Sequence, residues 1–134
     1  MAHGDGYFYN EFSYQLPQGN IDLLNNIIKL MLVVGYTPDV DAHVDYSDVS
    51  GFEVVGLGYG AGGETLTGKS LTRAVYTTFK ASDITWINLG VAAVSHAILI
   101  DTTLDCLLCC WEFTSFPDGG NYLINFDPTG IFDI

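Results

Sequence analysis

Apolar residues recur at every second position along much of this 134-residue chain. In residues 27–34 the even positions are all aliphatic, and Lys29 and Met31 lie between them. Side chains two residues apart lie on the same face of a β-strand. The pattern therefore predicts a strand with one face in the core and the other face, which carries Lys29 and Met31, toward water.

Three later segments show the same alternation and are predicted strands. Their apolar faces are Leu71, Val75 and Phe79; Leu107, Cys109, Trp111 and Phe113; and Tyr122, Ile124 and Phe126. Clusters of Gly, Pro, Asn and Asp separate the segments, and residues 20–29 are expected to form one or two helical turns at most. The chain thus predicts an all-β single domain, an antiparallel β-sandwich of jelly-roll type. Residues 21–134 form the sandwich, and residues 1–20 form an N-terminal arm or a first strand.

Residues 63–70, GETLTGKS, match the phosphate-binding P-loop pattern. A P-loop needs a helix after the motif, whereas the Thr-rich and aromatic residues 71–80 favour a strand. We therefore interpret the match as a hairpin: strands at 52–55 and 65–67, a glycine-rich loop at 56–63, and a turn at Gly68-Lys69. Asp101, after an apolar run, imitates a magnesium-supporting aspartate. A nucleotide-hydrolysing fold also needs crossover helices, and none is predicted between Ser70 and Asp101.

The charge balance excludes several partners. Four basic residues face sixteen acidic ones, which gives a formal net charge of −12. Nucleic-acid binding needs clustered Lys and Arg, so no nucleic-acid partner is expected. The most apolar stretch, residues 86–100, is interrupted by polar residues and is shorter than the ~18–20 residues of a membrane helix. With no secretory signal visible, we expect a soluble protein made in a cytoplasm, with no membrane partner.

No catalytic residue, metal site or cofactor is predicted. Cys106, Cys109 and Cys110 have CxxC spacing, but they lie in a predicted buried strand and no second ligand pair completes a zinc site. The alternating carboxylates of residues 39–48 leave two alternatives open, a calcium site and a solvated loop, and the failed EF-hand pattern favours the loop. His3, His43 and His96 share no motif, and His96 is expected to be a partly buried, hydrogen-bonded side chain.

Several short motifs occur in a recognisable order. They are IKLMLV at 28–33, YTPD at 36–39, GYGAGGETLTGK at 58–69, ASDITW at 81–86, the strand ending in IDTT at 100–103, and FDPTGI at 126–131. In this order they resemble a family of small tailed-bacteriophage virion proteins that are encoded among head and structural genes. The resemblance covers about residues 21–134.

The resemblance implies a capsid decoration or cement protein with no catalytic residues. Such a protein would form a homotrimer on the outside of the phage head, bind the major capsid protein, and be assembled in the host cytoplasm. The cysteine-rich strand at 106–110 departs from the family. Aromatic residues near the N-terminus belong to the core or to a docking arm, and Lys69 is a candidate partner for an acidic residue across a subunit contact. The candidate interface residues are Tyr7, Phe8, Tyr9, Phe12, Tyr14 and Lys69.

The alternative function is that of a tail or head-fibre knob, an adhesin-like binding module that recognises a host surface glycan or protein. Tyr46, Tyr59 and Phe116 are predicted to lie on loops, where their rings would stack on sugars.

Overall fold

Short antiparallel strands make up most of residues 6–134, which are the residues that the computed structural model describes. The strands are β1 Tyr7–Phe8, β2 Ile28–Val33, β3 Glu64–Thr65, β4 Ser70–Arg73, β5 Thr77–Lys80, β6 Ile84–Trp86, β7 Val94–Asp101, β8 Cys106–Ser115, β9 Tyr122–Ile124 and β10 Phe132–Asp133. The helices are α1 Asn10–Gln15, α2 Tyr46–Val49 and a 3-10 helix, Ser50–Phe52. The predicted all-β, antiparallel single domain is confirmed, and the finer jelly-roll assignment stays a prediction.

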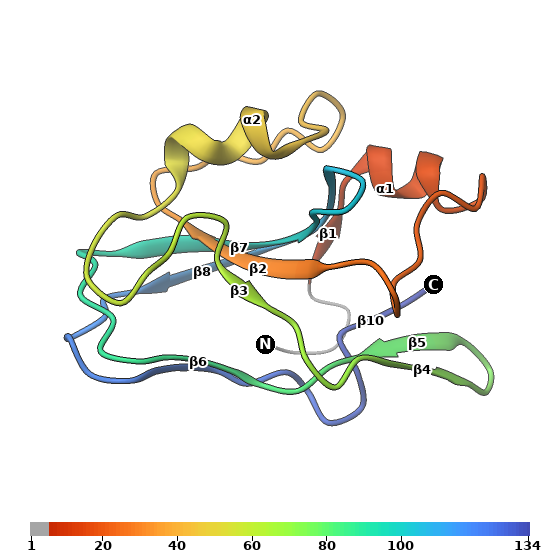
Figure 1. The fold of residues 1–134 in the computed structure, drawn as a ribbon. Coiled ribbons are helices and arrows are strands. Elements are labelled where there is room, and N and C mark those ends of the chain that lie inside the picture. The colour runs from red at the N-terminus through yellow and green to blue at the C-terminus, as the bar shows by residue number, and fades with distance from the viewer. Residues whose placement is uncertain (1–5) are drawn as a thin grey trace.

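The strands form two layers. A five-stranded sheet has the order β1-β8-β7-β2-β3, and the other layer consists of a three-stranded sheet, β10-β5-β4, and the pair β6-β9. Figure 1 shows the five-stranded sheet across the middle of the molecule, with α2 above it and β4, β5 and β6 below it. The helical segment is therefore a third layer on the face of the sheet that turns away from the smaller sheets.

Strand β2 is buried on both faces. Ile28, Leu30 and Leu32 belong to a large core between the β layers, and Met31 and Val33 belong to a second core under α2. The predicted water-facing side was wrong for Met31, which is fully buried. Residues 34–52 fold back over that face of the sheet. The alternating pattern within β2 cannot show that another segment buries this face.

A β-bulge divides strand β8. Leu99 pairs with Cys109 and Ile100 with Leu107, so Leu108 is an extra residue on the β8 side. An extra residue reverses which face the following side chains occupy. Leu107 accordingly lies in the α2 core while Cys109 lies in the large core, and the prediction that they share a face was wrong.

The segment from 70 to 80 is a hairpin rather than one strand. β4 and β5 pair from Ser70↔Lys80 to Arg73↔Thr77, and the chain turns at residues 74–76. Val75, expected on the apolar face with Phe79, is at this turn and is 88% exposed. The helical turns expected at 20–29 are reduced to a hydrogen-bonded turn closed by Asn26 N–H and Asp22 C=O.

The P-loop lookalike is built from strand and turn, as its sequence context indicates. It begins at Gly63, contains β3, turns at Gly68 and ends where β4 begins. Gly63 has a φ of 83°, and a Cβ there would overlap the Leu30 carbonyl of β2, so the position requires glycine. The predicted strand at 52–55 is instead the end of the 3-10 helix and a single bridge between Glu53 and Val33.

Candidate functional site

The N-terminal aromatic residues divide between core and surface. Tyr9 and Phe12 are buried, whereas Tyr7, Phe8 and Tyr14 are exposed, Tyr7 by 53% and Tyr14 by 64%. β1 is a strand rather than a free arm, because Tyr7 pairs with Cys110 and Phe8 with Cys109 of β8. The candidate interface residues that remain available for a partner are therefore Tyr7, Phe8 and Tyr14.

Phe8 joins the surface to the core. Its ring packs against Phe12 at a centroid distance of 5.5 Å and against Phe132 at 5.2 Å, and Phe132 stacks on Phe79 at 5.2 Å. An open groove at the same end of the molecule is lined by aliphatic side chains from the loop after α1, from β4 and from the C-terminal strand: Leu16, Ile21, Leu24, Leu71 and Ile134. This end of the molecule thus presents an apolar surface.

Tyr9 is held by a hydrogen-bonded chain under the helical layer. The Asp39 N–H donates to His43 Nδ1 at 3.3 Å, so this nitrogen is an acceptor, and the Tyr36 hydroxyl donates to it at 2.7 Å. The Tyr9 hydroxyl then donates to the Tyr36 oxygen at 2.8 Å. Burial raises the pKa of Tyr36 to about 12 and that of Tyr9 still further. This series of hydrogen bonds holds residues 36–43 against the sheet.

Lys69 is committed to a structural bond. Its Nζ donates to the backbone carbonyl of Asn26, and the Asn26 side-chain amide donates to Asp101 Oδ2 at 2.8 Å. Asp101, which is fully buried, also accepts the Leu104 N–H at 3.0 Å. The two residues that imitate a nucleotide site therefore meet at one asparagine and hold the turn before β2 against the end of β7. No helix follows Ser70, so the phosphate cradle is not formed.

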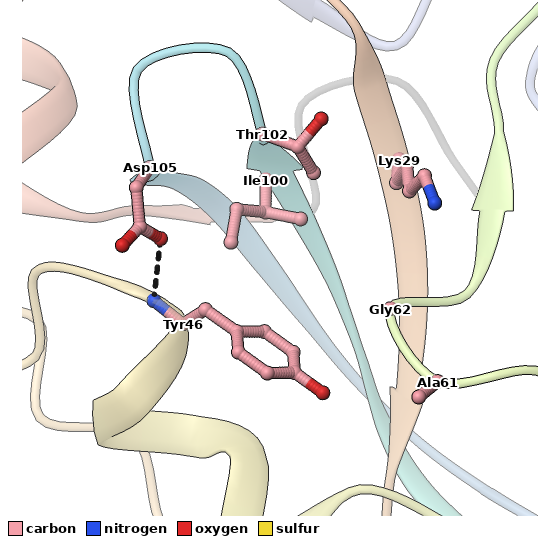
Figure 2. Close-up of a pocket in the computed structure, with 7 residues that line it drawn as sticks. All are labelled: Lys29, Tyr46, Ala61, Gly62, Ile100, Thr102 and Asp105. Atoms are coloured by element: carbon pink, nitrogen blue, oxygen red, sulfur yellow. Dashed lines mark hydrogen bonds between the residues drawn. The ribbon is translucent and has the colours of Figure 1, made fainter.

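A pocket of about 420 Å³ lies between α2, the loop at 61–62 and the end of β7. Figure 2 shows Lys29 and Asp105 on opposite sides of it, with Ile100 and the Tyr46 ring between them. The Tyr46 N–H donates to Asp105 Oδ1 at 3.0 Å. No hydrogen bond or ion pair joins the Lys29 side chain to another of residues 6–134. The lining of the pocket thus includes one ammonium group, one carboxylate and one aromatic ring.

Glu53 organises the glycine-rich loop beside this pocket. Its carboxylate accepts the Tyr46 hydroxyl at 2.5 Å, the Tyr59 hydroxyl at 2.6 Å and the Gly62 N–H at 2.7 Å. The bond to Glu53 raises the pKa of Tyr46 to about 12. Sequence reasoning missed Glu53, because one acid among sixteen has no local pattern. Of the predicted glycan-stacking residues, Tyr46 and Tyr59 are tied to Glu53 and Phe116 is exposed.

The acidic segment 39–48 contains the start of a helix. Asp45 and Asp48 form a capping box at α2, in which Asp48 Oδ2 accepts the N–H groups of Val44 and Asp45. These bonds hold the pKa of Asp48 below its ordinary value. Within residues 6–134 no three His, Cys, Asp or Glu side chains gather as metal ligands. The prediction of an extended loop was wrong for residues 46–48, which lie in α2.

The cysteines and His96 are core side chains. All three cysteines are buried free thiols, as predicted, and burial raises the pKa of Cys106 and Cys110 to about 12. His96 has the predicted hydrogen bond, between its Nδ1 and the Ser95 hydroxyl at 2.9 Å, but it is buried, with 6% exposure, rather than partly buried. Burial holds the His96 pKa below its ordinary value. His3 lies outside the described residues, as do the first five residues of the proposed arm.

No helix within residues 6–134 has the length and apolar character needed to cross a membrane. In comparisons with known proteins, no family model, no curated protein and no solved structure matches the chain.

Proposed function

We propose that the protein is a structural component of a tailed-bacteriophage virion, a decoration or cement protein on the outside of the head. It bridges major capsid subunits, self-associates as a homotrimer, and acts by burying surface across subunit boundaries rather than by catalysis. Its binding energy comes from apolar contact and hydrogen bonds at those boundaries.

The observation that carries the proposal is the exposure of large apolar side chains on turns and edges. Val75 is 88% and Leu57 81% exposed, and Tyr76, Phe116 and Tyr14 are also exposed. Isolated exposed apolar residues are ordinary, but several on protruding turns of one small domain favour contact with other protein surfaces. The groove beside Leu71 and Ile134 adds apolar surface at the same end as Phe8.

Two features of the sequence support the same function. The ordered motifs between residues 21 and 134 resemble small phage virion proteins. The net charge of −12 keeps such a protein soluble at the high local concentration of a virion surface.

Particles with and without the protein test the proposal. A ligand that binds only the assembled state stabilises it by mass action, so heads that lack the protein should release their DNA at lower temperature and after milder osmotic shock. Adding the purified protein back should restore resistance. Heads that survive heat and osmotic shock equally well without it would refute the cement function.

Electron cryomicroscopy of the same particles gives the location and copy number. Density on the head lattice at subunit boundaries is the expected result. Density on the tail, together with binding to a host glycan on an array, would favour the fibre-knob alternative instead.

A further inference from the structure

The charges of this chain are segregated. Residues 65–82 contain three of the four basic residues, Lys69, Arg73 and Lys80, and no acidic residue. This segment has a net charge of +3, and the remainder, with one basic and sixteen acidic residues, has −15. Residues 69–80 form the turn before β4, the strands β4 and β5, and the turn between them. We call these residues the basic hairpin.

Most of the basic hairpin is exposed, and two of its three basic side chains, those of Arg73 and Lys80, are available for docking. Figure 1 shows β4 and β5 projecting at one end of the lower layer. β4 is an edge strand that pairs only with β5 among the described strands, and all four of its residues are exposed. No side-chain hydrogen bond or ion pair joins Arg73 or Lys80 to another described residue. Val75 and Tyr76 add an exposed apolar tip.

A complementary surface lies on the other side of the molecule. Residues 39–53, which we call the acidic segment, contain five carboxylates and no basic residue. The acidic segment includes α2 and covers one face of the five-stranded sheet, whereas β5 packs through Phe79 against the core on the opposite face. Asp39 and Asp41 are exposed there. The molecule thus has a positive end and a negative layer that face different directions.

We infer that the basic hairpin of one copy docks on the acidic segment of a second copy. The inference rests on the self-association in the proposed function and assigns its surfaces. A second copy fits because this chain itself presents the strongly acidic surface that the hairpin complements. The two surfaces lie on opposite sides of the sheet, so they form a head-to-tail contact that closes into a ring or continues as a filament. A ring of three is the closed form that matches a homotrimer.

Charge reversal tests this contact through the molecular mass in solution. The hairpin variant carries Arg73→Glu and Lys80→Glu, and the segment variant carries Asp39→Lys and Asp41→Lys. Light scattering at about 50 mM salt, where screening is weak, should show assembled wild type and a monomer for each variant. One chain that carries all four substitutions should assemble again. An equimolar mixture of the two variants should form mixed complexes, because only unlike copies are then complementary, but it should form no closed ring of three, since two like copies would meet in such a ring.

Matched controls separate local from overall charge. The control variant carries Thr85→Glu and Thr114→Glu, which change the net charge by as much as Arg73→Glu does, at exposed positions outside both docking surfaces. Arg73→Glu should weaken assembly at least tenfold, and the control variant should change it less than twofold. Circular dichroism checks that each variant is folded. If the reversed variants do not fold, salt decides: wild-type assembly should dissociate between about 50 and 500 mM salt.

Several results would overturn the inference. These are a monomeric wild type, assembly that persists in the hairpin variant, a folded four-substitution chain that stays monomeric, and wild-type assembly unaffected by salt. A monomeric wild type that binds heads through Arg73 and Lys80 would assign the hairpin to the major capsid protein instead. Head stability distinguishes the two proposals. If the protein is monomeric in solution and still stabilises heads, only the second-copy contact is refuted. If heads are equally stable with and without the protein, the cement function is refuted.

Discussion

At the scale of single residues, the buried polar side chains of this protein serve the fold. Asp101 is the clearest case, because a fully buried carboxylate survives only when its oxygens accept hydrogen bonds. The Asn26 amide and the Leu104 N–H supply them. Together with the bond from Lys69 to the Asn26 carbonyl, they connect three segments that are distant in sequence.

Replacing Asp101 by alanine should lower the free energy of unfolding by about 3 kcal/mol. The substitution removes the acceptor of two part-buried hydrogen bonds, from the Asn26 amide and the Leu104 N–H, and a hydrogen bond to a charged group contributes about 1.5–3 kcal/mol. Urea denaturation measures the loss. The matched control is Glu64→Ala, an exposed carboxylate on β3, which should change stability by less than about 0.5 kcal/mol. A loss for Asp101→Ala no larger than for the control would contradict this role.

The residue scale also shows the limits of sequence reasoning. The burial of the cysteines, and a position for His96 away from the surface, could be predicted because the neighbours of these residues are apolar and recur with the period of a strand. The roles of Asn26 and Glu53 could not, since each depends on partners that only the folded chain brings close. The partners of Glu53 lie six to nine residues away, and those of Asn26 lie 43 and 75 residues away.

At the scale of elements, the alternation of apolar residues predicted the positions of the strands better than it predicted which segments pack on the faces of those strands. The β7 and β8 segments were recognisable because both are long and apolar. The bulge at Leu108 was not, because one extra residue has no signature in an already apolar run. The turn at 74–76 was missed for a similar reason, since Ala74, Val75 and Tyr76 are not typical turn residues.

The loop at 56–63 depends on Glu53. Glu53→Gln replaces one carboxylate oxygen with an NH2 group, which donates and cannot accept, so the substitution removes either the bond from Tyr46 or the two bonds from Tyr59 and Gly62. We expect a loss of about 1–3 kcal/mol in stability and faster proteolysis within the loop. A double-mutant cycle between Glu53→Gln and Tyr59→Phe should give a coupling of about 1 kcal/mol, and the same cycle with the exposed Tyr14→Phe should give none. Equal couplings in the two cycles would contradict the contact.

At the scale of the whole molecule, several buried acids with high pKa values make the fold sensitive to alkali. Burial raises the pKa of Cys106 and Cys110 from 9.0 to about 12, and that of Tyr36 from 10.0 to about 12. The unfolded chain releases these protons first, so the stability they contribute is complete below pH 9. It is lost progressively as pH rises from 9 to 12.

The urea concentration at the midpoint of unfolding should therefore decrease as the pH is raised from 7 to 10.5. Each thiol that ionises only in the unfolded state removes about 1.4 kcal/mol per pH unit above its ordinary pKa. Tyr36→Phe should flatten the dependence above pH 10, and Tyr7→Phe, which changes an exposed ring, should leave it unchanged. An unchanged midpoint over this range would show that the thiols and Tyr36 ionise equally well in the folded protein.

The five-stranded sheet has a core on each face, and the two cores are unequal. Among residues 6–134, twenty-four buried residues form the core between the β layers, whereas nine form the core under α2. The smaller core packs residues 34–52 against the sheet, and we expect this segment to open at a lower free energy than the sandwich does. Backbone amides of α2 would then exchange with solvent through a partial opening, before those of β2 and β7. If residues 34–52 open before the sandwich does, the acidic segment loses its structure more often than the rest of the fold.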